Sequence, residues 1–332
     1  MLSTKATRAF CGLPVVDTST VPPGTAAAVM GACYSLGSPH RGAENASFFL
    51  RTMSRHYTWA ASDPGVFDLR HGTMPLTGIV DVGDIAFHDM TLDEALAATE
   101  QAVRSLPPGV VPCVIGGDHT VTLAVVKALQ ARRSQPFHVV QFDHHLDLQI
   151  WGTAPADAAA ERDPIFHTNV MSHVSDCIGP GRLTQVGVSP YATVEAGVGD
   201  SMLRYLTGIG QQITVDSPEI ENAEAFRDAI GTGHDVYITV DVDVLDSAEM
   251  SATGYPAVVG LSMRRLLRLL DVVAQHNNVI GFDVVEFAAE REDRSAATLA
   301  DAHRAAHIVL HLLSWVRRQA SDEPQTTSGR LP

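Results

Sequence analysis

The sequence predicts an α/β fold in which helices cover both faces of a mainly parallel sheet. Short apolar runs typical of buried strands alternate with segments of helical periodicity along the 332-residue chain. Four of these apolar runs are followed directly by His, Asp or Glu side chains. Because alternating strands and helices build βαβ units with parallel strands, we expect those four carboxyl ends to meet at one edge of the sheet.

The first part of the chain is expected to form an arm, two strands and three helices. Residues 1–26 contain Thr, Pro and Gly without strong periodicity, so we predict an extended arm over the body. The apolar run at 26–33 and the alternating run at 79–87 predict strands. Helices are predicted at 46–57, 92–105 and 120–133. Thr91 is the expected N-cap of the second helix.

The remainder of the chain continues this alternation. Strands are predicted at 111–117, 139–142, 183–188, 212–215, 236–240 and 279–285. Helices are predicted at 197–207, 219–230, 262–276 (capped by Ser262) and 296–316. Residues 149–166 are expected to form a loop or weak helix over the site. We therefore predict one folded domain over residues 27–318 and a disordered tail over 319–332.

The composition is that of a soluble globular protein, with 45% hydrophobic and 18% charged residues. No apolar run reaches 18 residues, and the N-terminal stretch lacks the apolar segment of a signal peptide. The four cysteines are scattered and form no CxxC pair. Free thiols of this kind are typical of the reducing cytoplasm, which is where we expect the protein to work.

The net charge of −15 argues against nucleic acid or an anionic membrane as a partner. A strongly acidic chain is compatible with a cationic small-molecule substrate, and a bound metal would cancel part of the negative charge.

Polar side chains with the chemistry of metal ligands follow the four apolar runs. Asp118 and His119 follow 111–117. Asp241 and Asp243 follow 236–240 and, being two residues apart, are expected to face the same way on a strand end. Glu286 follows 279–285. The run at 139–142 is followed by Asp143, His145 and Asp147, which period-two alternation would place on one side if the chain stayed extended. Converging carboxylates repel one another unless a cation lies between them, which predicts a metal site.

The candidate ligands are His119, Asp143, His145, Asp147, Asp241 and Asp243. Four carboxylates and two imidazoles exceed the needs of one tetrahedral zinc ion. They suit two divalent ions roughly 3.5–4 Å apart that share bridging carboxylates and activate water as a nucleophile. An oxygen-rich shell favours manganese, and nickel or cobalt remain alternatives.

These residues resemble the metal signatures of a known family, the ureohydrolases, which include arginase and agmatinase. The matching motifs are GGDHT at 116–120, DHHLD at 143–147 and DVDVLD at 241–246. The resemblance extends from about residue 9 to 316, and the segments RAFCGLP at 8–14 and VDVGD at 80–84 are more similar to the agmatinase branch.

The resemblance implies a three-layer α/β/α sandwich around an eight-stranded, mainly parallel sheet. It also implies two Mn²⁺ ions, hydrolysis of a guanidino group to urea and an amine, and a homo-oligomer, either a trimer or a hexamer. By the same resemblance, Glu286 would pair with the substrate guanidinium. Asp147 would take part in catalysis as well as in metal binding.

Two segments depart from the family pattern. His167 matches the histidine of a His-Gly-Thr motif and is expected to shuttle a proton to the leaving amine, with His173 as a rival. The glycine of that motif is replaced, and Asn169 and Tyr255 are further candidate substrate contacts. The stretch DSAEMSATGYP at 246–256 also differs from the family. His144 is expected to point away from the metals and to act structurally.

An intact metal core with an unusual rim indicates that hydrolysis is retained while the substrate differs. An agmatine-like compound, a guanidino acid and a guanidino-bearing natural product are the candidates. Two alternatives are a homologue that binds metal without catalysis and a formimino-type hydrolase on the same scaffold.

Overall fold

The computed structural model describes residues 2–3, 9–58, 65–148, 164–192 and 199–320. Within them, a nine-stranded sheet has the order β1-β3-β2-β4-β9-β8-β5-β6-β7. The strands are β1 Leu2–Ser3, β2 Ala27–Ala32, β3 Ile79–Ile85, β4 Val111–Gly116, β5 His138–Phe142, β6 Leu183–Val188, β7 Gly210–Thr214, β8 Asp235–Asp241 and β9 Asn278–Val285. Strands β2 to β9 pair in parallel, which confirms the predicted parallel sheet of eight strands.

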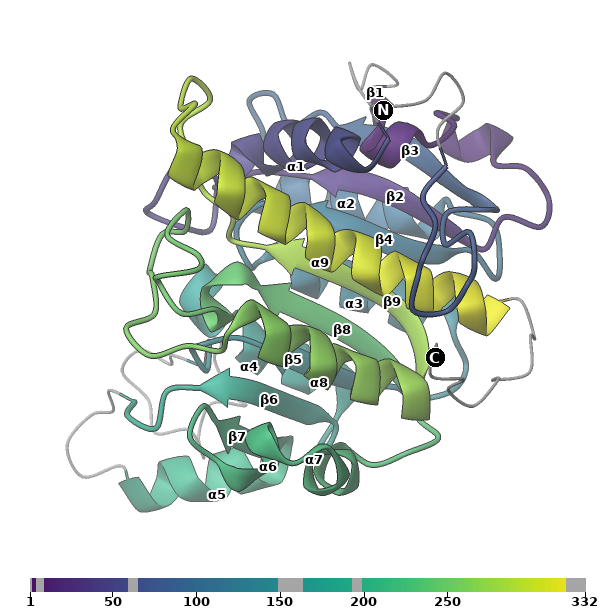
Figure 1. The fold of residues 1–332 in the computed structure, drawn as a ribbon. Helices are drawn as coiled ribbons and strands as arrows, with labels where there is room; N and C mark the ends of the chain where they lie inside the picture. Colours follow the sequence, from purple (N-terminus) through teal and green to yellow (C-terminus); the bar gives the residue numbers. More distant parts are fainter. Residues whose placement is uncertain (1, 4–8, 59–64, 149–163, 193–198, 321–332) are drawn as a thin grey trace.

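Helices cover both faces of this sheet (Figure 1). They are α1 Ala46–Ser54, α2 Leu92–Arg104, α3 Val121–Arg132, α4 Val170–Ile178, α5 Gly199–Ile209, α6 Pro218–Glu221, α7 Ala223–Ile230, α8 Met263–His276 and α9 Ala296–Ala320. Helices α1, α8 and α9 lie on the near face in Figure 1, and α2, α3 and α4 lie behind the sheet. The predicted three-layer sandwich is therefore confirmed.

The alternation of side chains along the strands divides the core in two. On β5, Val140 and Phe142 pack into the core beneath α1, α8 and α9, whereas Val139 packs into the core beneath α2, α3 and α4. On β8, Ile238 faces the first core and Tyr237 the second. Because both faces are covered, these strands are buried along almost their whole length, which explains why apolar residues occur at consecutive positions in the sequence instead of alternating with polar ones.

The predicted helix starts are confirmed where a polar cap marks them. Thr91 and Ser262 accept hydrogen bonds from the backbone N–H groups of Glu94 and Arg265. The helix predicted at 219–230 is instead two helices, α6 and α7. They are separated at Asn222, whose side chain accepts from two N–H groups of the next turn and so starts a new helix.

The ends of the chain differ from the prediction in two places. Within the predicted arm, β1 pairs antiparallel with β3 and adds a ninth strand to the sheet. Helix α9 continues to Ala320, past the predicted start of the tail at 319, because the Gln319 side chain donates to the carbonyls of Ala274 and Asn277. Most of the predicted loop at 149–166, namely residues 149–163, lies outside the described residues, as do residues 321–332.

The four strands whose ends carry the candidate ligands are neighbours in the sheet, in the order β4-β9-β8-β5. Their carboxyl ends therefore lie side by side, as predicted from the parallel topology.

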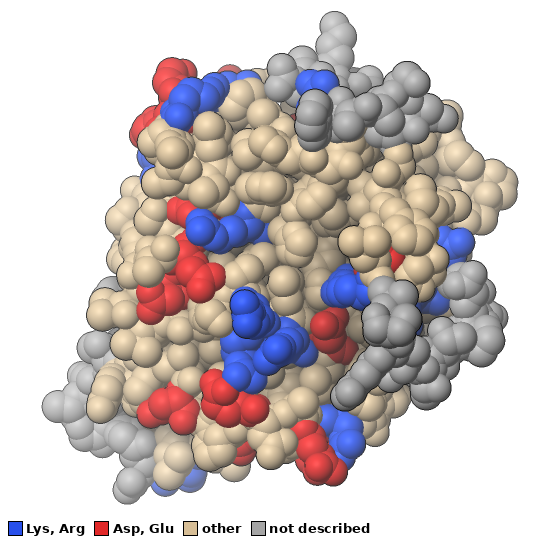
Figure 2. Space-filling model, in the orientation of Figure 1, with Lys and Arg blue, Asp and Glu red and all other residues tan. Residues whose placement is uncertain are grey.

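On the face that carries α8 and α9, basic and acidic side chains lie in small groups beside one another (Figure 2). Arg265, for example, pairs with Glu221. Among the described helices, none is both long and apolar enough to cross a membrane.

Candidate metal centre and active site

Two overlapping groups of ligand atoms lie at this edge of the sheet. One comprises His119, Asp143 and Asp241, and the other comprises Asp143, His145 and Asp243. Asp143 belongs to both, since its Oδ2 lies 3.2 Å from His119 Nδ1 and its Oδ1 lies 3.6 Å from His145 Nδ1. One carboxylate thus lies between two sets of donors, which is the arrangement of a bridging ligand.

His119 is fully buried within the cluster, as is Asp143. Its Nδ1 lies 2.9 Å from Asp147 Oδ2 and 3.4 Å from Asp241 Oδ2. This nitrogen is buried and has no hydrogen-bond partner of suitable geometry. On the other side of the ring, Nε2 lies 3.0 Å from the hydroxyl of Thr239, which fixes the ring orientation. Asp147 therefore joins the cluster through His119.

The charges of the cluster are not balanced by the protein alone. Burial and the neighbouring Asp243 and Asp143 raise the pKa of Asp241 well above its usual range. Burial, together with Asp143, raises the pKa of Asp243 to about 7. Burial would also raise the pKa of Asp143, but the hydrogen bonds of this carboxyl to His119 and His145 lower it. Four acids and two imidazoles in so small a volume are poorly satisfied without additional positive charge.

This donor set fits two divalent cations. Oxygen and imidazole ligands are present in two groups, each with its ligand atoms within 4.8 Å of one another. A cation in the first group would also satisfy the buried, unpartnered Nδ1 of His119.

The ligands are positioned by tight turns rather than by extended strands. Strand β5 ends at Phe142, and Asp143 accepts a hydrogen bond from the backbone N–H of His145. Asp241 accepts in the same way from the N–H of Asp243, 2.9 Å away. Such turns form when a carboxylate binds the N–H two residues on.

The predicted alternation of Asp143, His145 and Asp147 along an extended chain is therefore wrong, because Asp147 has left-handed backbone with φ of 49°. The same correction applies to Asp241 and Asp243, since Asp243 lies in the 3₁₀ turn Val242–Val244. The predicted convergence of these side chains is nevertheless observed.

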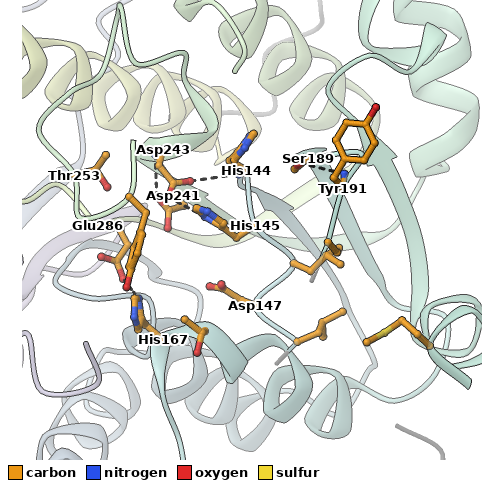
Figure 3. Close-up of a pocket in the computed structure, with 16 residues that line it drawn as sticks. His144, His145, Asp147, His167, Ser189, Tyr191, Asp241, Asp243, Thr253 and Glu286 are labelled. Carbon is orange, nitrogen blue, oxygen red and sulfur yellow. Dashed lines mark hydrogen bonds and ion pairs between the residues drawn. The ribbon is translucent and has the colours of Figure 1, made fainter. Parts of the chain in front are cut away.

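Glu286 and His167 lie beside the metal ligands (Figure 3). Glu286 Oε1 accepts a hydrogen bond from the backbone N–H of His119 at 2.8 Å and lies 3.3 Å from His167 Nδ1. Burial would lower the pKa of His167, but the hydrogen bond with Glu286 raises it. The two side chains thus form one unit that is attached to the ligand-bearing segment after β4.

The turn that carries His167 is attached to that same segment through Gly37. The N–H of His167 donates to the carbonyl of Gly37 at 2.9 Å. The N–H of Gly37 donates to Asp118 Oδ2 at 2.7 Å. Asp118 is fully buried and precedes His119 directly. The hydrogen bonds of Gly37 to His167 and to Asp118 therefore fix the position of His167 relative to His119. The sequence did not reveal this role of Gly37 or of Asp118.

A pocket of about 530 Å³ opens over the cluster. Its described lining comprises His144, His145, Leu146, Asp147, Leu148, His167, Thr168, Ser189, Tyr191, Ala192, Met202, Asp241, Asp243, Thr253, Tyr255 and Glu286. Tyr255 was predicted as a substrate contact and does line the pocket. His144 also lines it but belongs to neither ligand group, and His173 is not part of the described lining.

Asn169 is the predicted site residue that the structure does not bring to the pocket. Its side chain accepts from the N–H of Phe166 at 2.8 Å and donates to the carbonyl of Pro164 at 2.9 Å. Both ends of the amide are therefore used within the turn, and the side chain is buried away from the described lining. The geometry gives Asn169 a structural role in place of the predicted substrate contact.

Tyr191 and Met202 line the pocket although the sequence did not single them out. The position of Tyr191, three residues beyond the end of β6, was the available signal, since ligands bind beyond strand ends in such sheets. Met202 lies in α5, and nothing local to it indicated a site.

The sequence model of the arginase family matches residues 25–314. The chain belongs to the arginase family. Among individual relatives, proclavaminate amidinohydrolase of Streptomyces clavuligerus is 31% identical over 80% of this chain and 81% of its own length. N(1)-aminopropylagmatine ureohydrolase of Thermococcus kodakarensis is 25% identical over 70% of this chain and 74% of its own length.

Solved structures of the arginase family share the fold. The structure of proclavaminate amidinohydrolase from Streptomyces clavuligerus superposes with a TM-score of 0.73 at 24% identity, covering 94% of this chain and 97% of that one. A hypothetical agmatinase from Burkholderia thailandensis superposes with a TM-score of 0.74 at 24% identity, covering 97% and 94%.

Proposed function

We propose that this arginase-family chain is a dinuclear-metal amidinohydrolase, which hydrolyses the guanidino group of a small substrate to urea and an amine. The observation that carries the proposal is the joint placement of Glu286 and His167 against two overlapping ligand groups. The names of relatives such as agmatinase and proclavaminate amidinohydrolase support the same reaction class.

His119, Asp143, His145, Asp147, Asp241 and Asp243 would hold the two ions. When bound, the ions would acidify water and so provide the nucleophile at neutral pH. The mixed shell of carboxylates and imidazoles favours Mn²⁺, with Ni²⁺ or Co²⁺ as alternatives.

Glu286 would hold the substrate. Its carboxylate is fixed by the His119 N–H and lies beside the ligand groups, where it can accept hydrogen bonds from the planar guanidinium. This contact orients the guanidinium carbon toward the nucleophile.

His167 would supply the proton for the departing amine. Its contact with Glu286 favours the protonated imidazole, and its ring lies in the pocket wall beside the site where the C–N bond would break. Once the proton has moved to the amine nitrogen, urea and the free amine can leave.

A homo-oligomeric state and a cytoplasmic location stay predictions.

The test is urea release by Mn²⁺-loaded protein from a panel of guanidino compounds, with metal content measured in parallel. We expect urea from at least one compound and two ions per chain.

Asp241→Ala should lose metal and lower the turnover at least about 100-fold, because it removes one of the three ligands of the first group.

Asp235→Ala is the matched control, since Asp235 lies at the opposite end of the same strand β8, where it pairs with Arg133. It should retain both ions and full turnover. Absence of urea from the whole panel, with two ions bound, would overturn the proposal and favour a homologue without catalysis.

A further inference from the structure

Beyond the metal cluster, Glu286 and His167, the described pocket wall carries no Lys, Arg, Asp or Glu side chain. It consists of His144, Leu146, Leu148, Thr168, Ser189, Tyr191, Ala192, Met202, Thr253 and Tyr255. A substrate tail that ended in a carboxylate would need a cation here, and a tail that ended in an ammonium would need an acid. A charge removed from water without such a partner costs binding free energy.

Tyr255 offers an aromatic surface that its neighbours hold in place. Its ring stacks on His167 with centroids 5.8 Å apart and an interplanar angle of 28°. His40 contacts the same ring edge-on, with centroids 4.4 Å apart. The side chain nevertheless remains 45% exposed and lines the pocket. A fixed but exposed aromatic ring beside the reacting end is suited to contact an apolar group.

Tyr191 extends the apolar wall away from the metal cluster. Figure 3 shows it across the pocket from Glu286 and His167, and its side chain is 88% exposed. Together with Tyr255, it gives the described lining two exposed aromatic side chains. Exposed aromatic surface that lies within one pocket, rather than singly over the surface, indicates a binding site.

The pocket is also larger than a short diamine or amino-acid chain requires. Its volume of about 530 Å³ lies within the range of sites that enclose drug-sized ligands.

We propose, on the basis of the amidinohydrolase function above, that the substrate guanidino group is carried by an uncharged apolar or aromatic tail, which Tyr255 and Tyr191 bind. The guanidinium end meets Glu286 and the metal cluster, and the tail lies along the two tyrosines and Met202.

The test compares three guanidines with similar linkers: agmatine, 4-guanidinobutyrate and 4-phenylbutylguanidine. We expect kcat/KM for urea release to be at least about tenfold higher for the phenyl compound than for either charged one.

Tyr255→Ala and Tyr191→Ala should each lower kcat/KM for the phenyl compound about tenfold, mainly through KM. Tyr255→Phe should restore it, because the ring is retained. Leu69→Ala is the control, since Leu69 is 83% exposed and lies outside the pocket lining.

Turnover of agmatine or 4-guanidinobutyrate in preference to the phenyl compound would overturn the apolar tail and leave the amidinohydrolase function standing. Absence of urea from all three compounds would instead count against the proposed function. Calorimetric titration of the Mn²⁺-loaded protein then tests the tail by itself. Tighter binding of the phenyl compound than of agmatine, lost in Tyr255→Ala, supports the inference, and equal or weaker binding overturns it.

Discussion

Glu286 is held in one orientation by the N–H of His119 and by His167. In Glu286→Gln the amide oxygen can still accept the His119 hydrogen bond, so the backbone should not move. The charge that attracts a guanidinium is lost, and we expect kcat/KM to fall by at least about 100-fold. Urea assays together with metal analysis check this expectation.

Both ions should stay bound in Glu286→Gln. Glu290→Gln provides the control, because Glu290 is an exposed acid on the following loop. If Glu286→Gln instead strips the metal, the glutamate belongs among the ligands and the assignment of substrate and metal residues is wrong.

The convergence of the candidate ligands could be predicted because they lie at or just after the ends of apolar runs whose strands are neighbours in a parallel sheet. The position of His167 could not, since it depends on Gly37 and Asp118, which lie 130 and 49 residues away in sequence. Contacts between backbone groups so far apart leave no periodicity in the sequence. Asn169 was assigned incorrectly for a related reason, because its neighbours in the turn use both ends of its amide.

At the scale of elements, helix α9 supports the loop that carries Thr253 and Tyr255. Asp301 Oδ2 accepts hydrogen bonds from the N–H and hydroxyl of Ser251, each at 2.8 Å, and from the N–H of Ala252 at 3.0 Å. The Asp301 side chain is buried, so water cannot easily replace it. One carboxylate therefore fixes the edge of the substrate pocket to the helix.

Asp301→Ala should leave these donors without an acceptor and lower the free energy of unfolding by about 2–3 kcal/mol. We also expect KM to rise, because the loop that bears Tyr255 is released. Urea denaturation and steady-state kinetics measure the two effects. Asp301→Asn retains an acceptor oxygen and should lose less stability, and an Ala variant as stable as the parent would refute the role.

The strands and most helices could be predicted from periodicity and caps, which are local properties. The sequence predicts α6 and α7 as a single helix because the apolar spacing continues across Asn222. Only the cap at that residue separates the two helices. Strand β1 was missed because its two residues gain strand geometry from β3 and not from their own pattern. The turns at Asp143 and Asp241 were not predicted, because an aspartate followed by any two residues is too common a pattern to identify a turn by itself.

At the scale of the whole molecule, stability should depend on histidines that α9 buries against the segment after α1. His307 Nδ1 lies 2.7 Å from the hydroxyl of Tyr57, and His303, His311, Arg70 and Asp68 lie around it. Burial, followed by the charges of His311, Arg70 and His303, lowers the pKa of His307 from 6.5 to about 4. The unfolded chain therefore binds a proton more readily than the folded one between these values.

The free energy of unfolding should accordingly be highest above pH 6.5 and should fall by about 1–2 kcal/mol between pH 6.5 and 4, through this histidine. Urea denaturation of the parent and of His307→Gln at pH 7.5 and 4.5 tests this. The metal centre contributes equally to both proteins, so its contribution cancels when the change in the free energy of unfolding between the two pH values is compared between parent and variant. An identical pH dependence in the two proteins would show that His307 does not titrate in this range.

Asp147 and Glu286 are two of the four non-glycine residues with left-handed backbone in the described part of the chain, with φ of 49° and 62°. Such backbone costs about 1 kcal/mol or more per residue. Selection for thermal tolerance alone would thus favour glycine at both positions, while selection for turnover would retain the carboxylates. Directed evolution of this chain toward higher stability should therefore be screened for activity at every round, because two of these four strained positions lie within its active site.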